Sequence, residues 1–181
     1  MAFGDRKKKK YRDFAENIDG EIVYNGELYR YSGENAAPYS DFRKRAGVLA
    51  AAALISVVTA GTFAAPGTTD RFYIVLPLIT SIILAVLMCC SLAGVMRRGE
   101  VIRQFDVDGK LNHLKGEAVL ASFFSAATFI AYLVSLFTSG RGEYSMVSSI
   151  AFPVLMAISV YSDYVIFHLF RAIVWEKQKK D

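Results

Sequence analysis

Polar side chains that could do chemistry gather in the last of four long apolar runs of the chain. Tyr161, Tyr164, His168 and Arg171 are spaced i, i+3, i+7 and i+10, so a helix places them on one face, with Asp163 on its flank. Phenol, imidazole and carboxyl groups at that spacing could relay protons or line a polar cleft. The alternative interpretation, which we favour, is an interfacial belt of Tyr, His and Arg side chains with one structural carboxylate.

Asp163 requires a partner if it lies within a membrane. An aspartate near the centre of a membrane-spanning helix costs about 2.5–3.5 kcal/mol, so one that is kept there normally faces other helices and is paired. With Arg171 as the inner anchor, Asp163 lies about two helical turns inside the interface. We therefore predict that the carboxylate pairs with an arginine reaching inward from the end of another helix, namely Arg45, Arg97 or Arg98.

The sequence offers little for catalysis or for binding a cofactor. Histidine occurs only at positions 113 and 168, and the chain has no Gly-rich phosphate loop and no His/Cys/carboxylate cluster with the spacing of a metal site. We therefore assign no catalytic, cofactor-binding or metal-binding residue. A lipid-acting enzyme built from Asp163, His168 and nearby tyrosines remains an alternative.

The elements that must position these side chains are membrane helices. Of the 181 residues, 54% are hydrophobic, and the charged residues gather in blocks between the apolar runs. A helix that crosses a bilayer needs about 20 apolar residues. We predict an all-α membrane protein whose domain at 46–171 is a bundle of four transmembrane helices, at 46–65, 72–96, 118–139 and 144–170.

Two of the runs carry residues suited to helix packing. The first is rich in alanine, and small residues let helix backbones approach closely in lipid. The third has hydroxyl side chains along one side of a helix, at Ser122, Ser125, Thr128, Tyr132 and Ser135. We expect this side to face protein rather than lipid, and we include Tyr132 with Asp163 in the candidate polar site.

Residues 1–45 form a basic segment before the first run. Its lysine run suits contact with anionic lipid headgroups, through Lys7, Lys8, Lys9 and Lys10. Further on, Asn25-Gly26 is the preferred pair for a type I′ turn and lies between two stretches rich in strand formers. We predict a small cytoplasmic β-hairpin near 21–31, which must pack on helix ends, on another loop or on a partner. Asp108-Gly109 marks a second turn, in a second small hairpin.

The distribution of basic residues predicts the orientation. Ten Lys and Arg residues lie in the N-terminal segment, five in the loop at 97–117 and four from Arg171 onward, whereas the two remaining turns carry one each. Because cytoplasmic loops are enriched in Lys and Arg, we expect both termini, including the tail at 172–181, to be cytoplasmic. The expected location is the cell membrane, in particular a bacterial cytoplasmic membrane.

Three functions fit this pattern. The first is a non-enzymatic accessory or scaffold subunit of a larger membrane complex, because the chain combines a packing helix with a hairpin that needs support. The second is a small oligomeric transporter or channel that uses Asp163, and the third is the lipid-acting enzyme. The expected partners are the lipid bilayer and other membrane subunits or further copies of the chain. We expect no nucleic acid, because the net charge of +4 is accounted for by the membrane flanks.

Overall fold

Four long helices make up most of the structure, a computed structural model that describes residues 14–16, 21–24, 26–32, 38–63, 65, 68, 71–139 and 145–178. The lysines at 7–10 lie outside the described residues. All four helices are long and apolar enough to cross a membrane. They are α2 (Tyr39–Thr62), α3 (Phe72–Met96), α5 (Asn112–Ser139) and α6 (Met146–Ala172).

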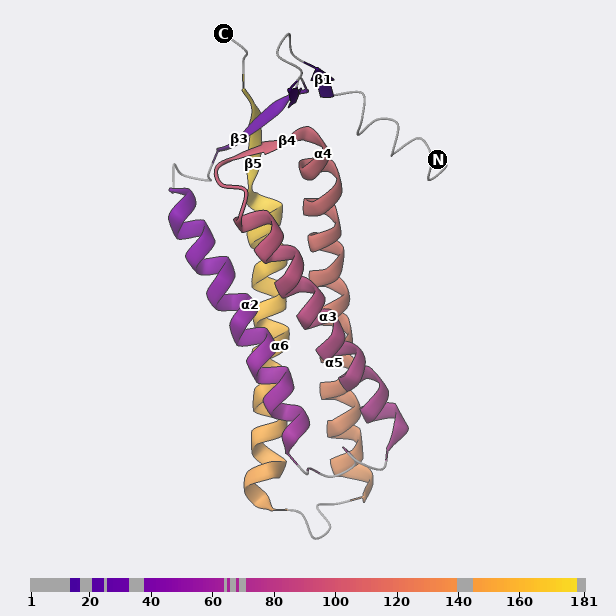
Figure 1. Cartoon of the computed structure of the whole chain (residues 1–181). Helices are drawn as coiled ribbons and strands as arrows, with labels where there is room; N and C mark the ends of the chain where they lie inside the picture. The colour runs from indigo at the N-terminus through magenta and orange to yellow at the C-terminus, as the bar shows by residue number, and fades with distance from the viewer. Residues whose placement is uncertain are drawn as a thin grey trace.

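The helices form one up-and-down bundle (Figure 1). Around the bundle the packing order is α2, α3, α5, α6 and back to α2, so each helix lies against two neighbours. Two apolar clusters fill the interior. One, nearer the chain termini, includes Met88, Leu114 and Ile166, and the other includes Ile74 and Phe152. The predicted four-helix bundle is confirmed as an arrangement of helices.

Helices α2 and α5 begin earlier than predicted, α5 at Asn112 rather than at 118, whereas α6 begins two residues later than predicted. Helix α2 starts at Tyr39 rather than at 46, because Tyr39 and Phe42 are buried on the same face as the small residues that follow. Helix α3 has the predicted bounds. Helix α6 starts at Met146, where the Ser145 hydroxyl caps it by accepting a hydrogen bond from the Val147 amide at 3.2 Å.

The predicted hairpin around Asp108-Gly109 is wrong. The segment is helical throughout, as α4 (Gln104–Asp106) and a π-helical turn (Val107–Leu111) that leads directly into α5. Leu111, Leu114 and Ala118 are all buried at i, i+3 and i+7, so burial of a helical face outweighs the local turn preference. Ion pairs also support the helical form, because the buried Asp106 carboxylate pairs with Arg98 and with Lys110, at 3.6 Å from the lysine.

A three-stranded antiparallel sheet covers the end of the bundle that carries the termini (Figure 1). Its central strand β3 (Leu28–Ser32) pairs on one side with β4 (Val101–Arg103) and on the other with β5 (Val174–Lys177). Tyr29 is opposite Ile102 in one register and opposite Lys177 in the other. Three distant parts of the sequence therefore meet at one end of the bundle.

The predicted hairpin at 21–31 is also wrong. Strand β2 (Ile22–Tyr24) pairs with β1 (Phe14–Glu16), and β3 pairs with β4 and β5. The Tyr24 side chain folds back across Gly26, and its hydroxyl donates a hydrogen bond to the Glu27 carbonyl at 3.2 Å. A side chain at position 26 would meet that ring, so Gly26 serves this close approach rather than a two-residue turn.

An aromatic cap, defined here as Tyr31, Tyr39, Phe42, Phe170 and Trp175, joins the sheet to the helices. The Tyr31 ring lies 5.3 Å from Tyr39, 5.6 Å from Phe42 and 5.8 Å from Trp175, between ring centroids. The rings of Phe42 and Phe170 are 5.3 Å apart, which links α2 to α6. Aromatic pairs at these separations contribute beyond the area they bury. Strand β3 is therefore held by packing as well as by its ladders.

Side-chain contacts join β5 to β3 and to Glu27, the residue that precedes β3. Lys177 forms an ion pair with Glu27, and the Ser32 hydroxyl donates to the Glu176 carboxylate at 3.1 Å. The hydrogen bond from Lys177 lowers the pKa of Glu27 below its ordinary value, because it favours the charged carboxylate. The tail predicted at 172–181 thus contains a strand of the sheet.

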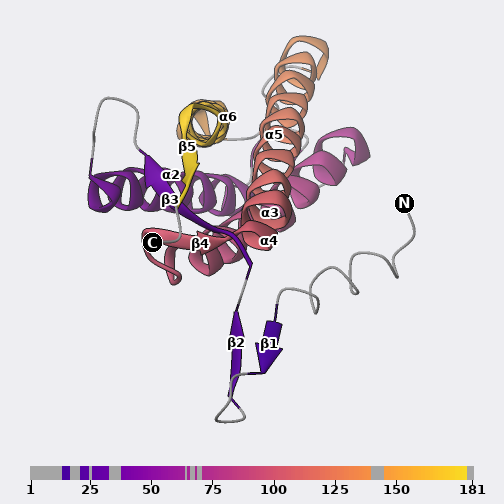
Figure 2. The same cartoon turned by 90° about the horizontal axis from the view of Figure 1, so that it is seen from above.

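Strands β1 and β2 form a separate two-stranded ribbon that extends away from the helices (Figure 2). Arg103 of β4 attaches this ribbon to the sheet. Its guanidinium lies over the rings of Phe14 and Tyr24, at 5.3 Å and 4.8 Å from their centroids. We refer to β1 and β2 as the ribbon below.

Candidate functional site

Asp163 lies inside the bundle, on the buried face of α6. Only 1% of its surface is exposed, and Ser159, Ile166 and Phe170 of the same face are buried with it. Along the helix axis it is about 13 Å from Ala172, at ~1.5 Å per residue. The prediction that this carboxylate faces other helices is confirmed.

The predicted ion pair with an arginine is not formed. Among the described residues, neither carboxylate oxygen of Asp163 has a hydrogen-bond partner. Arg98 instead pairs with Asp106, and Arg45 and Arg97 are exposed at the end of the bundle. In their observed positions Arg98 pairs with Asp106, and Arg45 and Arg97 are hydrated. Turning any of these side chains toward Asp163 would remove water from its guanidinium group, which is costly.

Small polar and apolar side chains of the other three helices lie near the level of Asp163 in the bundle. The Cys89 thiol of α3 is within electrostatic range of the Asp163 carboxyl and donates a hydrogen bond to the Ala50 carbonyl of α2 at 3.5 Å. The hydroxyl oxygens of Ser125 on α5 and Ser159 on α6 are 3.2 Å apart, and these two helices run antiparallel. One turn closer to the sheet, Ala121 is therefore at the level of Asp163.

A polar layer separates the two apolar clusters of the interior. Helices α5 and α6 supply it, and it consists of Ser125, Thr128, Ser159, Ser162 and Asp163, all of which are buried. The prediction that the hydroxyl side of the third run faces protein is confirmed, because Tyr132 and Ser135 are buried too. Asp163 is the only carboxyl group of this layer.

The predicted face of Tyr161, Tyr164, His168 and Arg171 does not join Asp163. These four side chains are exposed on the outside of α6, with Tyr161 67% and Tyr164 55% exposed. The Tyr164 and His168 rings contact each other, with centroids 4.4 Å apart. Tyr164 follows Asp163 by one residue, about 100° around the helix, and this step places it beyond the buried face formed by Ser159, Ser162, Asp163 and Ile166. The belt interpretation fits this arrangement better than the relay.

Tyr132 is also separate from Asp163. Its hydroxyl donates to the Ser149 carbonyl at 2.9 Å, and its ring lies 4.6 Å from that of Phe152. Ser149 is about 21 Å from Asp163 along α6, at ~1.5 Å per residue. Tyr132 therefore packs in the half of the bundle far from the sheet.

Sequence reasoning missed Glu117, a partly buried carboxyl group within the bundle. Glu117 of α5 accepts a hydrogen bond from the Ser91 hydroxyl of α3 at 3.0 Å, and its other oxygen is buried without a partner among the described residues. Helical spacing could have identified Glu117 as a residue near the bundle interior. It follows the buried Leu114 by three positions and directly precedes the buried Ala118. The predicted third helix began at 118 and therefore did not include Glu117.

Within the described residues, no group of three or more His, Cys, Asp or Glu side chains could hold a metal ion. Comparison of the chain with protein-family models, with curated proteins and with solved structures finds no match. Function must therefore be argued from the arrangement of these residues.

Proposed function

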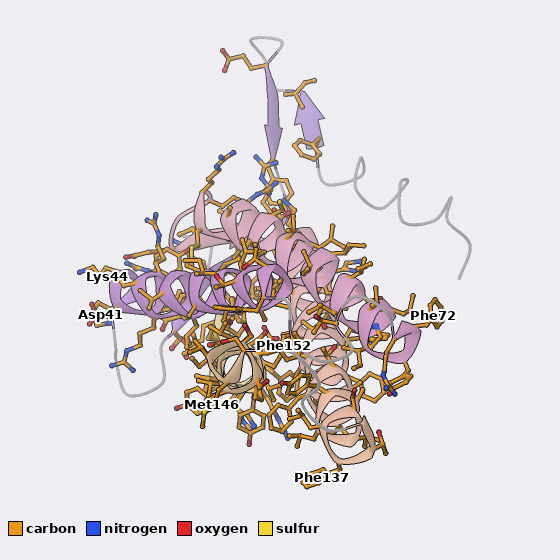
Figure 3. The ribbon with its side chains drawn as sticks, turned by 90° about the horizontal axis from the view of Figure 1, so that it is seen from below. Asp41, Lys44, Phe72, Phe137, Met146 and Phe152 are labelled. Atoms are coloured by element: carbon orange, nitrogen blue, oxygen red, sulfur yellow. The ribbon has the colours of Figure 1, made fainter. Side chains whose placement is uncertain are left out.

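We propose that this chain is an integral membrane protein that spans the bilayer four times. The length and apolar character of the four helices support this, as does the outer surface of the bundle. Large apolar side chains cover that surface, among them Ile79, Ile83, Phe123 and Ile130. Figure 3 shows Phe72 and Phe137 directed away from the bundle, whereas Phe152 lies between the helices. A continuous apolar surface of this kind suits lipid.

The sheet end of the bundle faces the cytoplasm in this proposal. Three segments rich in Lys and Arg meet there, and only two of the 21 basic residues lie in the turns at the opposite end. The positive-inside rule then orients the whole molecule.

Cysteine labelling tests this orientation. In a background with Cys89 and Cys90 replaced by alanine, we expect a membrane-impermeant maleimide added to intact cells to label Met146→Cys and not Gln178→Cys. Both positions are exposed, at opposite ends of the bundle, and disrupting the cells should make both reactive. Labelling of Gln178→Cys in intact cells would reverse the orientation, and equal labelling of both would argue against insertion.

We infer further that the protein acts by assembly, as an accessory or scaffold subunit. The observation that carries this is the ribbon. Ile22 is 77% exposed on it, in a part of the chain that lies beyond the helices and therefore beyond the lipid. An isolated two-stranded ribbon is at best marginally stable in water, so a protein partner would stabilise it. Large side chains fill the bundle interior, which suits a structural role better than a pathway.

Photocrosslinking from the ribbon tests the assembly role. With a photoreactive amino acid at position 22, we expect illumination of native membranes to give one discrete crosslinked product. The control is the same amino acid at Lys44, which is exposed on the outer side of α2 (Figure 3). Arg103→Ala should detach the ribbon from the sheet. If the crosslinked product is then lost, the product is assigned to the surface of the ribbon.

Monomeric protein with no discrete product from position 22 would contradict the assembly role. A product formed equally from position 44 would contradict the assignment to the ribbon. Identification of the crosslinked band by mass spectrometry distinguishes a second copy of the chain from another membrane subunit.

A transporter or channel is the second candidate, and one observation favours it, namely the buried Asp163 carboxyl, which has no ion-pair partner within the described part of the chain. Ile74, Tyr132 and Phe152 fill the interior beyond the polar layer, so a pathway would require these side chains to move or an oligomer to supply it. The lipid-acting enzyme gains no support, because Asp163 and His168 face opposite sides of α6.

A further inference from the structure

Asp163 stands apart from the other carboxyl groups whose surroundings the structure describes. Asp106 and Glu27 are ion-paired, and Glu117 accepts a hydrogen bond from Ser91. Asp163 has no ion-pair partner among the described residues, and the polar group that interacts with its carboxyl is the neutral Ser159 hydroxyl, although Asp163 is 1% exposed in the bundle interior. Its environment is therefore suited to a carboxyl group without charge.

The physical argument rests on the cost of an unpaired ion. Moving an isolated carboxylate from water into an apolar interior is far more costly than moving the neutral acid, which loses only ordinary hydrogen bonds. The polar layer provides hydroxyl groups for a neutral acid, with Ser162 beside Asp163 and Ser159 one helical turn away. An arginine would balance the negative charge of an ionised Asp163, but these neutral hydroxyl groups do not.

The charged and titratable groups on the neighbouring helices do not change this conclusion. On α3 the Cys89 thiol, which donates a hydrogen bond to the Ala50 carbonyl, is neutral, and on α5 the nearest carboxyl along the helix, Glu117, adds negative charge rather than compensating it. On α2 the nearest charged side chain along the helix, Arg45, is exposed. On α6 itself Tyr164 and His168 are exposed on the outside.

We propose that Asp163 is a proton-binding site in the polar layer, occupied by one proton when the bundle is closed. Binding forms one O–H bond between a carboxylate oxygen and a proton delivered by water, and release returns that proton to water. The bound proton removes the only negative charge of the polar layer, which favours close packing of the four helices around Asp163. Release would leave an unpaired ion and would favour opening of the sheet end, which is the nearer end.

This inference does not rest on the assembly role. A scaffold subunit and a transporter could both carry such a site, and the ribbon crosslink and the protonation of Asp163 are measured independently.

Infrared spectroscopy of the protein in lipid bilayers tests the proposal. At neutral pH we expect the wild type to show a carbonyl band of a neutral carboxylic acid that Asp163→Asn lacks. Glu117→Gln, the matched control at the other partly buried carboxyl, should keep the band. The band should disappear at alkaline pH as the acid ionises.

A second measurement uses the wild type alone, in case the variant does not fold. Labelling the side-chain carboxyl carbon of aspartate with carbon-13 should shift the band, which assigns it to an aspartic acid. Asp106 is ion-paired and does not contribute. If the wild type has no neutral-acid band at neutral pH, or if the band does not shift on labelling, Asp163 is ionised or the proton is elsewhere, and the proposal is overturned.

Discussion

Replacing Phe42 by alanine is expected to lower the free energy of unfolding by about 3–5 kcal/mol, the usual range for a buried phenylalanine. Phe42 is buried and contacts the rings of Tyr31 and Phe170, so its loss opens a cavity between β3, α2 and α6. It lies in the part of α2 before residue 46, which the proposed insertion leaves in water. Both the cost of the cavity and the transfer of apolar surface into water therefore contribute.

Unfolding by a denaturing detergent, followed by circular dichroism and by Trp175 fluorescence, measures this effect. Trp175 belongs to the aromatic cap, so its emission should move toward that of an exposed indole in the variant. The control is Phe72→Ala, since Phe72 is exposed at the start of α3, and we expect a change within about 0.5 kcal/mol. Equal effects of the two substitutions would mean that the cap does not stabilise the bundle.

Replacing Phe152 by alanine is expected to cost less, about 2–3 kcal/mol, although Phe152 is fully buried. In lipid the transfer contribution disappears, because the surroundings of an unfolded helix are as apolar as the bundle interior. The cavity and the lost contact with the Tyr132 ring remain. The same measurement applies, with Phe137→Ala as the control, because Phe137 is 89% exposed on α5.

The ratio of these two effects distinguishes lipid from water as the solvent of the bundle. If water surrounded all four helices, Phe152→Ala should cost at least as much as Phe42→Ala, because both side chains are buried to the same degree. A Phe152→Ala effect larger than that of Phe42→Ala would therefore contradict the proposed insertion.

The helices were predictable because their signal is local. An apolar run of about 20 residues specifies a helix by itself, and the bounds of α3 agree with the prediction. The early starts of α2 and α5 were missed because they depend on Tyr39, Phe42 and Leu111 being covered by distant segments. Hydropathy along one stretch of chain cannot reveal such contacts.

The sheet was not predictable in the same way. Asn25-Gly26 suggested a local partner for the strand at 28–32, but its observed partners are more than 70 residues away. The tail strand β5 is only four residues long, and its sequence shows little alternation of apolar and polar residues, so no local pattern identifies it as a strand. Strand pairing of this kind is decided by tertiary packing, here by the contact of Tyr31 with Trp175.

The candidate site was predicted in part. Asp163 was found because a carboxyl group inside an apolar run is rare, and its inward orientation follows from the cost of exposing it to lipid. Its expected grouping with Tyr164 and His168 failed because one residue step turns a side chain to another face of the helix. Asp163 has no hydrogen-bond partner among the described residues. This property depends on which side chains of the other three helices lie near it, and the sequence alone does not reveal that packing.

The central position of β3 has a consequence for how the chain is made. The ribosome synthesises β3 before any of the four long helices, but β5 only after the last of them. If the chain spans the bilayer four times, as proposed, the two strands can meet only after translation has passed all four helices, and a single missed crossing would leave β3 and β5 on opposite sides. Strand β4 follows α3 and can pair with β3 earlier, so until then the edge of β3 that pairs with β5 stays open to foreign strands. Closure of the sheet thus marks the completion of membrane threading.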